Sequence, residues 1–75
     1  MSERTLYEFE EAIIELKHDG SMRRESWPEN MMCVKLNRLG EVPYFELFLS
    51  SGESTTYAFP TEDLLGVDWY VPEPI

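Results

Sequence analysis

The residues best suited to chemistry in this chain are two arginines followed closely by a tryptophan. Arg23 and Arg24 are the densest positive charge in the sequence, and Trp27 follows three positions after Arg24. A guanidinium can meet a phosphate and an aromatic ring can cover a base, so together they suit a flat, anionic molecule such as a nucleotide. The alternative is that the arginines make surface ion pairs and that the aromatic residues form the core. The other aromatic residues that could offer a stacking face are Tyr44, Tyr57, Phe59 and Trp69.

Catalysis and metal binding find little support in the same inventory. His18 is the only histidine and Cys33 the only cysteine, so neither a nucleophilic triad nor a structural zinc set can be assembled. Glu62, Asp63 and Asp68 could act as paired carboxylates, but roles at a helix start and in a turn explain them more simply. Cys33 lies in an apolar run and is interpreted as a buried small hydrophobe. We therefore expect a non-enzymatic protein with no catalytic residue, no metal and no cofactor.

The first twenty residues carry the pattern of an amphipathic helix. The run from Thr5 to Glu8 is typical of a capping box at a helix start. His18 in the last turn complements the helix dipole, and Gly20 is expected to end the helix in a left-handed conformation. The apolar stripe between these signals consists of Leu6, Phe9, Ile13 and Leu16.

Beyond this helix the pattern changes to short extended runs separated by turn residues. In the run that begins at residue 31, Met32, Val34 and Leu36 should share one face of a strand. Thr61 is expected to cap a second helix of about one turn. The fold class is therefore α+β: a small antiparallel sheet of about four or five strands with one N-terminal helix and a short C-terminal helical turn. The expected strands cover 21–25, 31–37, 44–49, 54–58 and 67–71.

Length and charge limit the classes of partner. Residues 1–75 make a single domain, and a core this small makes self-association as a dimer or tetramer a reasonable expectation. The net charge of -9 disfavours nucleic acid as a partner and leaves open a basic protein surface. Because no apolar run is long enough for a membrane span and the N-terminal region is acidic, we expect a cytoplasmic protein without a membrane partner.

Several short strings recur here in the order and spacing of a known family. They are Phe9-x-x-Ala12, Leu16-Lys17-x-x-Gly20, Arg24-x-x-Trp27, Ser51-Gly52 at a hairpin tip, and Asp63-Leu64-Leu65-Gly66-x-Asp68-Trp69. With these strings the chain resembles the Thoeris anti-defence sponge family of phages and prophages, over nearly its whole length. The likeness depends on finding the Arg-x-x-Trp string and the terminal string at the expected separation.

The resemblance implies a homo-oligomer that sequesters a nucleotide-derived immune signal, such as a cyclic ADP-ribose isomer or a cyclic oligonucleotide, without cleaving it. By matching positions, Trp27 would stack on a base, and Arg24 would meet a phosphate or brace its loop. Asp68 and Trp69 fit a folding role equally well, with Trp69 in the core and Asp68 capping a neighbouring loop. The ligand-binding residues that the resemblance implies, near a protomer junction, are Arg24, Trp27, Tyr57, Thr61 and Asp63.

Two hypotheses follow. In the first, the protein is a non-enzymatic sponge for a cyclic nucleotide-like or cyclic ADP-ribose-like signal in the host cytoplasm, and Trp27→Ala should abolish binding while leaving the fold intact. In the second, it is an acidic interaction protein that inhibits a host enzyme by covering a basic surface or by imitating nucleic acid. The second hypothesis predicts salt-sensitive binding to a basic host protein and no affinity for small molecules.

Overall fold

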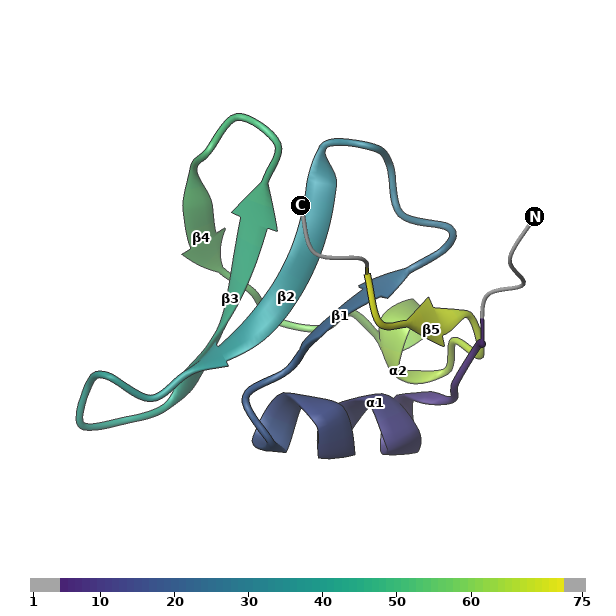
Figure 1. The fold of residues 1–75 in the computed structure, drawn as a ribbon, viewed down its shortest axis with the longest axis horizontal. Coiled ribbons are helices and arrows are strands. Elements are labelled where there is room, and N and C mark those ends of the chain that lie inside the picture. The colour runs from purple at the N-terminus through teal and green to yellow at the C-terminus, as the bar shows by residue number, and fades with distance from the viewer. Residues whose placement is uncertain (1–4, 73–75) are drawn as a thin grey trace.

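A five-stranded antiparallel sheet with two helices makes up the described part of the chain, residues 5–72 of a computed structural model (Figure 1). The strands lie in the order β4-β3-β2-β1-β5. The predicted α+β class, with an N-terminal helix and a short second helix near the C-terminus, is confirmed. In chain order the elements are α1 (Phe9–Lys17), β1 (Ser21–Arg24), β2 (Met31–Asn37), β3 (Tyr44–Leu49), β4 (Ser54–Thr56), α2 (Thr61–Leu64) and β5 (Trp69–Tyr70).

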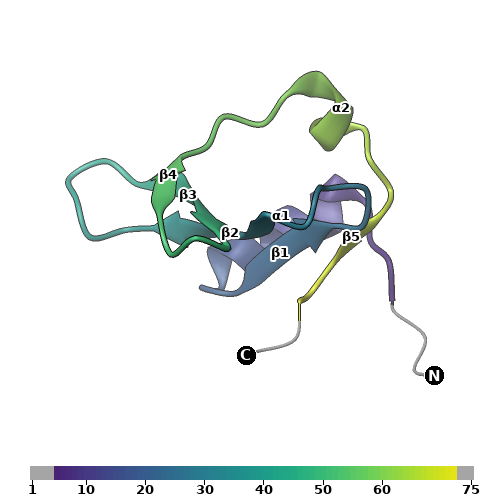
Figure 2. The same ribbon diagram turned by 90° about the horizontal axis from the view of Figure 1, so that it is seen from above.

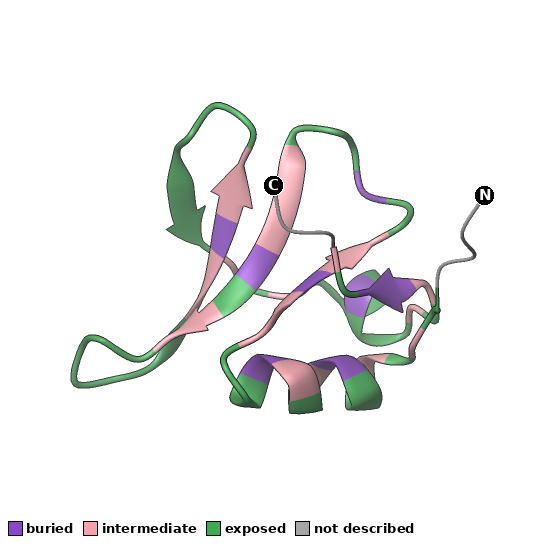
Figure 3. Cartoon of the chain, in the orientation of Figure 1, coloured by how far each residue is buried: buried purple, intermediate pink, exposed green. Residues whose placement is uncertain are grey.

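The core lies between α1 and one face of the sheet (Figure 3). Met22 of β1 pairs with Val34 of β2, and Val34 pairs with Leu47 of β3, so these three buried side chains form one row across that face. Two buried residues of α1, Ala12 and Leu16, belong to the same cluster. The helix therefore buries its apolar stripe against the centre of the sheet.

The chain from β4 through α2 to β5 arches over a face of the sheet (Figure 2). Phe59 lies in this arch and packs edge-on against Phe9, Phe45 and Tyr57, with ring centroids 4.9–5.2 Å apart. Its ring centroid is also 5.9 Å from that of Trp69, which is fully buried. The aromatic rings thus join the arch to α1 and to the sheet.

The ends of α1 differ from the sequence-based expectation. The N-cap is Glu8, not Thr5, and the capping box joins Glu8 to Glu11, because both carboxylates reach backbone N–H groups of the first turn. His18 is the C-cap, as expected, and its Nδ1 donates to the carbonyl oxygen of Ile14 at 2.8 Å. The left-handed residue is Asp19, with φ of 65°, rather than Gly20.

The strand predictions are confirmed for β2 and β3 and need correction elsewhere. A bulge between Met31 and Cys33 shifts the register, so Met31, rather than Met32, packs on the core. The last strand is only two residues long, and Val67 is 63% exposed instead of joining Trp69 inside. The N-cap of α2 is Pro60, with no side-chain cap, so the expected capping by Thr61 is wrong.

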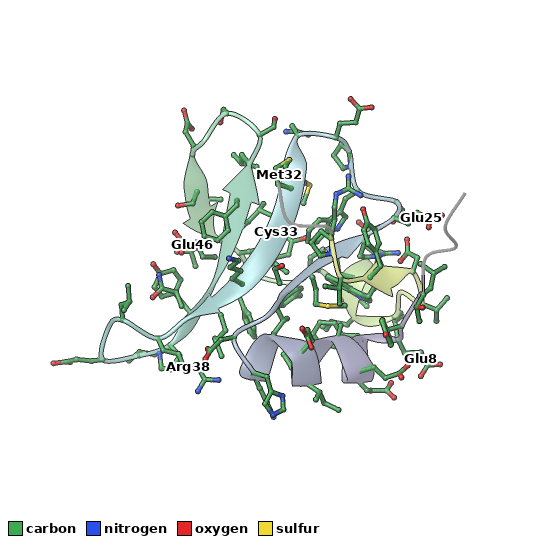
Figure 4. The ribbon with its side chains drawn as sticks, in the orientation of Figure 1. Glu8, Glu25, Met32, Cys33, Arg38 and Glu46 are labelled. Atoms are coloured by element: carbon green, nitrogen blue, oxygen red, sulfur yellow. The ribbon has the colours of Figure 1, made fainter. Side chains whose placement is uncertain are left out.

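The other face of β2 and β3 is partly apolar. Cys33 pairs with Phe48, and Lys35 lies over the Phe48 ring at 5.8 Å from its centroid. Met32, Cys33 and Glu46 all belong to these two strands (Figure 4). Cys33 is half-buried rather than buried, and burial raises the pKa of its thiol.

Two features are absent from the described residues, 5–72. Within that range, no helix has the length and apolar character that crossing a membrane requires. In the same part of the chain, no three His, Cys, Asp or Glu residues gather closely enough to hold a metal ion.

Candidate functional site

A hollow of about 510 Å³ opens between the β1–β2 loop and the start of α2. Its aromatic walls come from Trp27 and Tyr57, and its charged groups come from Arg24, Glu62 and Asp63. The loop brings one wall and the arch brings the other, so residues more than thirty positions apart meet here. The remaining lining residues are Ser26, Pro28 and Met31.

Asp63 is the centre of the hydrogen bonds beneath this hollow. Only 2% of the residue is exposed, and its Oδ1 accepts from Nη1 of Arg24 at 2.8 Å and from Nε1 of Trp27 at 3.4 Å. Its Oδ2 accepts from the hydroxyl of Tyr57, and its backbone carbonyl accepts from Nε1 of Trp69 at 2.9 Å. A buried carboxylate is tolerated when it is paired and hydrogen-bonded in this way. The one side chain therefore fixes both aromatic walls.

Arg24 is held between two carboxylates. Its Nη1 pairs with Asp63 at 2.8 Å, and its Nε pairs with Oδ1 of Asp68 at 2.7 Å. Burial opposes the positive charge, but the hydrogen bonds to both carboxylates outweigh it and raise the pKa of Arg24. The guanidinium also packs closely on Gly66, where an added Cβ would lie 2.7 Å from Cζ. Of the two roles considered for Arg24, these contacts favour bracing of the loop.

Asp68 joins the segment 63–69 to the β1–β2 loop by hydrogen bonds. Its Oδ2 accepts from the backbone N–H of Ser26 at 3.0 Å, and its carbonyl accepts from the N–H of Glu25 at 3.0 Å. Burial would raise the pKa of Asp68, but the hydrogen bonds from Arg24 and Ser26 outweigh it and lower the pKa. Trp69 is fully buried. The expected folding role of Asp68 and Trp69 is therefore confirmed.

Arg23 points to the face of β1 opposite Arg24 and holds the β1–β2 loop by hydrogen bonds. Its Nε donates to the carbonyl of Met31 at 2.9 Å, and its Nη2 donates to the carbonyls of Trp27 and Pro28 at 2.9 and 3.0 Å. Its Nη1 donates to the carbonyl of Arg24 and to the hydroxyl of Tyr70, both at 2.9 Å. All five N–H groups of the guanidinium are thus used within the protein.

Trp27 is more deeply buried than expected for a ring that stacks on a base. It is 8% exposed, and its ring meets Tyr57 and Trp69 edge-on, with centroids 5.6 and 5.4 Å apart. It forms one wall of the hollow but leaves little ring surface free. This burial argues against the expectation that Trp27→Ala would leave the fold intact, because removing a buried indole leaves a large cavity.

The structure gathers most of the predicted ligand-binding residues around one hollow. Arg24, Trp27, Tyr57 and Asp63 all line it, whereas Thr61 is exposed at the start of α2 and is not among the lining residues. Burial, followed by the hydrogen bond to Asp63, raises the pKa of Tyr57 above its ordinary value, so this hydroxyl stays protonated as a donor.

Sequence reasoning missed other lining residues. Ser26 and Pro28 lie within or directly after the Arg-x-x-Trp string and could have been found from their position in the loop. For Glu62 the sequence indicates a helix-start role or a paired carboxylate, and not a ligand-binding role. Met31 was missed because nothing in the sequence marks the bulge that turns it toward the core.

Most of the chain matches a known protein family. Residues 7–72 match the family model described as Tad2-like, the Thoeris anti-defense 2-like domain. The matched range includes every residue that lines the hollow, and also Asp68. No curated protein matches the chain.

Proposed function

Because the chain belongs to the Tad2-like family of Thoeris anti-defense domains, we propose that it binds a nucleotide-derived Thoeris signal and withholds it from the host's immune effector. The family match over residues 7–72 carries this proposal, and the expected ligand is a cyclic ADP-ribose isomer or a related cyclic nucleotide. The protein acts as a sponge in the host cytoplasm, so the ligand is held and later released unchanged.

The hollow supports this proposal as the place of binding. Its volume of about 510 Å³ is in the range of small-molecule sites, and its lining combines two aromatic walls with a few fixed polar groups. The walls are held by Asp63 and by the loop contacts of Arg23 and Asp68, so the site is organised before a ligand arrives. Tyr57 and the small exposed part of Trp27 provide the aromatic surface, and Asp63 holds both in place.

Self-association is a second part of the proposal. The half-buried side chains on the outer face of β2 and β3, Met32, Cys33 and Phe48, form an apolar surface suited to a second copy of the chain. Sedimentation velocity at micromolar concentration tests it, and a single species with the mass of one chain would contradict it.

Calorimetric titration tests the sponge directly. The purified protein is titrated with a panel of cyclic ADP-ribose isomers, linear ADP-ribose and cyclic di- and trinucleotides, and we expect saturable binding of at least one member. Mass spectrometry of the ligand recovered after heat denaturation of the protein should show an unchanged mass, as a sponge requires. A hydrolysed ligand would identify an enzyme instead.

A matched pair of variants locates the site. Ser26→Phe adds a ring to an exposed residue of the hollow, and we expect it to reduce binding at least ten-fold by filling the space. Ser51→Phe makes the same change at the exposed β3–β4 turn and should bind like the unmodified protein. No heat with any panel member would refute the proposal and, with salt-sensitive binding to a basic host protein, would favour the acidic interaction protein.

A further inference from the structure

The hollow presents hydrogen-bond acceptors and no cation that is free to meet a phosphate. We propose that it binds the donor-bearing part of its ligand, ribose hydroxyls or base amino groups, and that the phosphates of the ligand stay at the mouth, toward water. This inference rests on the proposed function and specifies which end of a nucleotide enters the site.

Arg24 is the only cation among the residues that line the hollow. Its charge is compensated by Asp63 and Asp68, both within 2.8 Å, and its Nη1 also donates to the carbonyl of Glu62 at 3.2 Å. To meet a phosphate, the guanidinium would have to leave a carboxylate that is 3% exposed, and that carboxylate would be left buried without its charge partner. Arg24 is therefore a positioning residue of the hollow.

Arg23 is the cation next to Arg24 in the sequence. Its five N–H groups are used by four backbone carbonyls in and beside the loop and by the hydroxyl of Tyr70. It holds the wall of the hollow from the other face of the sheet and has no N–H left for a ligand. With Arg23 and Arg24 counted against Glu62, Asp63 and Asp68, the surroundings of the hollow carry a net charge of about -1 at neutral pH.

Three polar groups of the hollow remain for a ligand. The carboxylate of Glu62 is exposed at the rim and makes no hydrogen bond or ion pair with any residue in the range 5–72. The hydroxyl of Ser26 and the phenolic oxygen of Tyr57 can also accept. A free carboxylate repels a phosphate but accepts strongly from a hydroxyl or an amino group. The free polar groups therefore favour the sugar or the base.

The sign of one change in affinity tests this inference. Glu62→Gln removes the rim charge without changing the size of the side chain, and Glu41→Gln makes the same change of net charge on the exposed β2–β3 hairpin. Both variants are titrated with the panel member that binds the unmodified protein tightest. We expect Glu62→Gln to weaken binding about five-fold, the difference between a charged and a neutral acceptor, relative to Glu41→Gln.

The opposite results would overturn the inference. If phosphates enter the hollow, Glu62→Gln relieves repulsion and tightens binding several-fold, and inorganic pyrophosphate at millimolar concentration displaces the ligand. Equal affinity of the two variants would also overturn it, because Glu62 would then not face the ligand. These results leave the proposed function standing, whereas an unmodified protein that binds no panel member overturns the sponge and this inference together.

Discussion

Replacing Asp63 by asparagine should destabilise the fold by about 2 kcal/mol. The substitution keeps the shape of the side chain, and Oδ1 can still accept from Arg24 and Trp27 while the new amide faces the hydroxyl of Tyr57, which can turn to accept. What disappears is the charge opposite Arg24, in a pair whose side chains are 14% and 3% exposed. Breaking a buried pair costs about 3–5 kcal/mol, and Asp68 continues to compensate Arg24, which lowers the cost to about 2 kcal/mol.

Urea unfolding followed by tryptophan fluorescence measures this loss. A domain of this size has an m value of about 1 kcal/mol/M, so the midpoint should fall by about 2 M. The total stability expected for 75 residues is about 4–11 kcal/mol, so the variant should remain folded in water. Asp63→Ala leaves three donors without their acceptor, at about 1–3 kcal/mol each, and should be close to unfolded.

A neighbouring variant controls for the change in net charge. Glu62→Gln alters the same charge one position earlier, on an exposed side chain without a partner in the range 5–72, and should move the midpoint by less than about 0.5 M. If Asp63→Asn behaves like this control, the carboxylate does not anchor the loop and the reasoning about the hollow is wrong.

Three further predictions concern the same network. Trp27→Ala should cost about 3–5 kcal/mol, and Trp27→Phe clearly less, in the same urea assay; equal stability of Trp27→Ala and the unmodified protein would contradict the burial of the indole. Gly66→Ala should lower the melting temperature because its Cβ would approach Cζ of Arg24 to 2.7 Å, and the loss should shrink in an Arg24→Ala background, as a double-mutant cycle would show. The folded-state pKa of Asp68 lies below its ordinary 3.8, so its pairing stabilises the fold above about pH 4 and this stabilisation is lost as the pH falls through the lowered value. Asp68→Asn should therefore flatten the acid limb of a curve of unfolding free energy against pH. An unchanged acid limb would refute this.

Local patterns in the sequence were sufficient to predict the elements but not the contacts between them. The alternating apolar residues of β2 and β3 gave their bounds correctly, because strand length follows from side-chain periodicity. The bulge at Met31 left no such signal, since it depends on pairing with a distant strand. The cap at Glu8 was missed because Thr5 offered an equally good capping pattern one turn earlier.

The candidate site shows the same division. The resemblance named four residues that meet at the hollow, and for Arg24 it left open a phosphate contact or a bracing role. The pairing with Asp63 and Asp68 favours bracing. Neighbouring residues of a strand face opposite sides, so Arg23 and Arg24 could not have formed one positive patch. The central role of Asp63 is a matter of long-range geometry, because its three side-chain donors come from positions 24, 27 and 57.

A continuous series of edge-on and tilted ring contacts runs from the hollow to α1 and limits which substitutions the protein tolerates. Trp27 contacts Trp69, and Trp69 contacts Phe9 of the helix, with centroids 5.4 and 5.6 Å apart. A substitution of Trp27 that reshapes the hollow for a different ligand therefore also loosens the packing of the core. Under the proposed function, adaptation to a changed signal is then confined to the few solvent-facing positions around the opening, such as Ser26 and Glu62, where substitutions cost little folding energy.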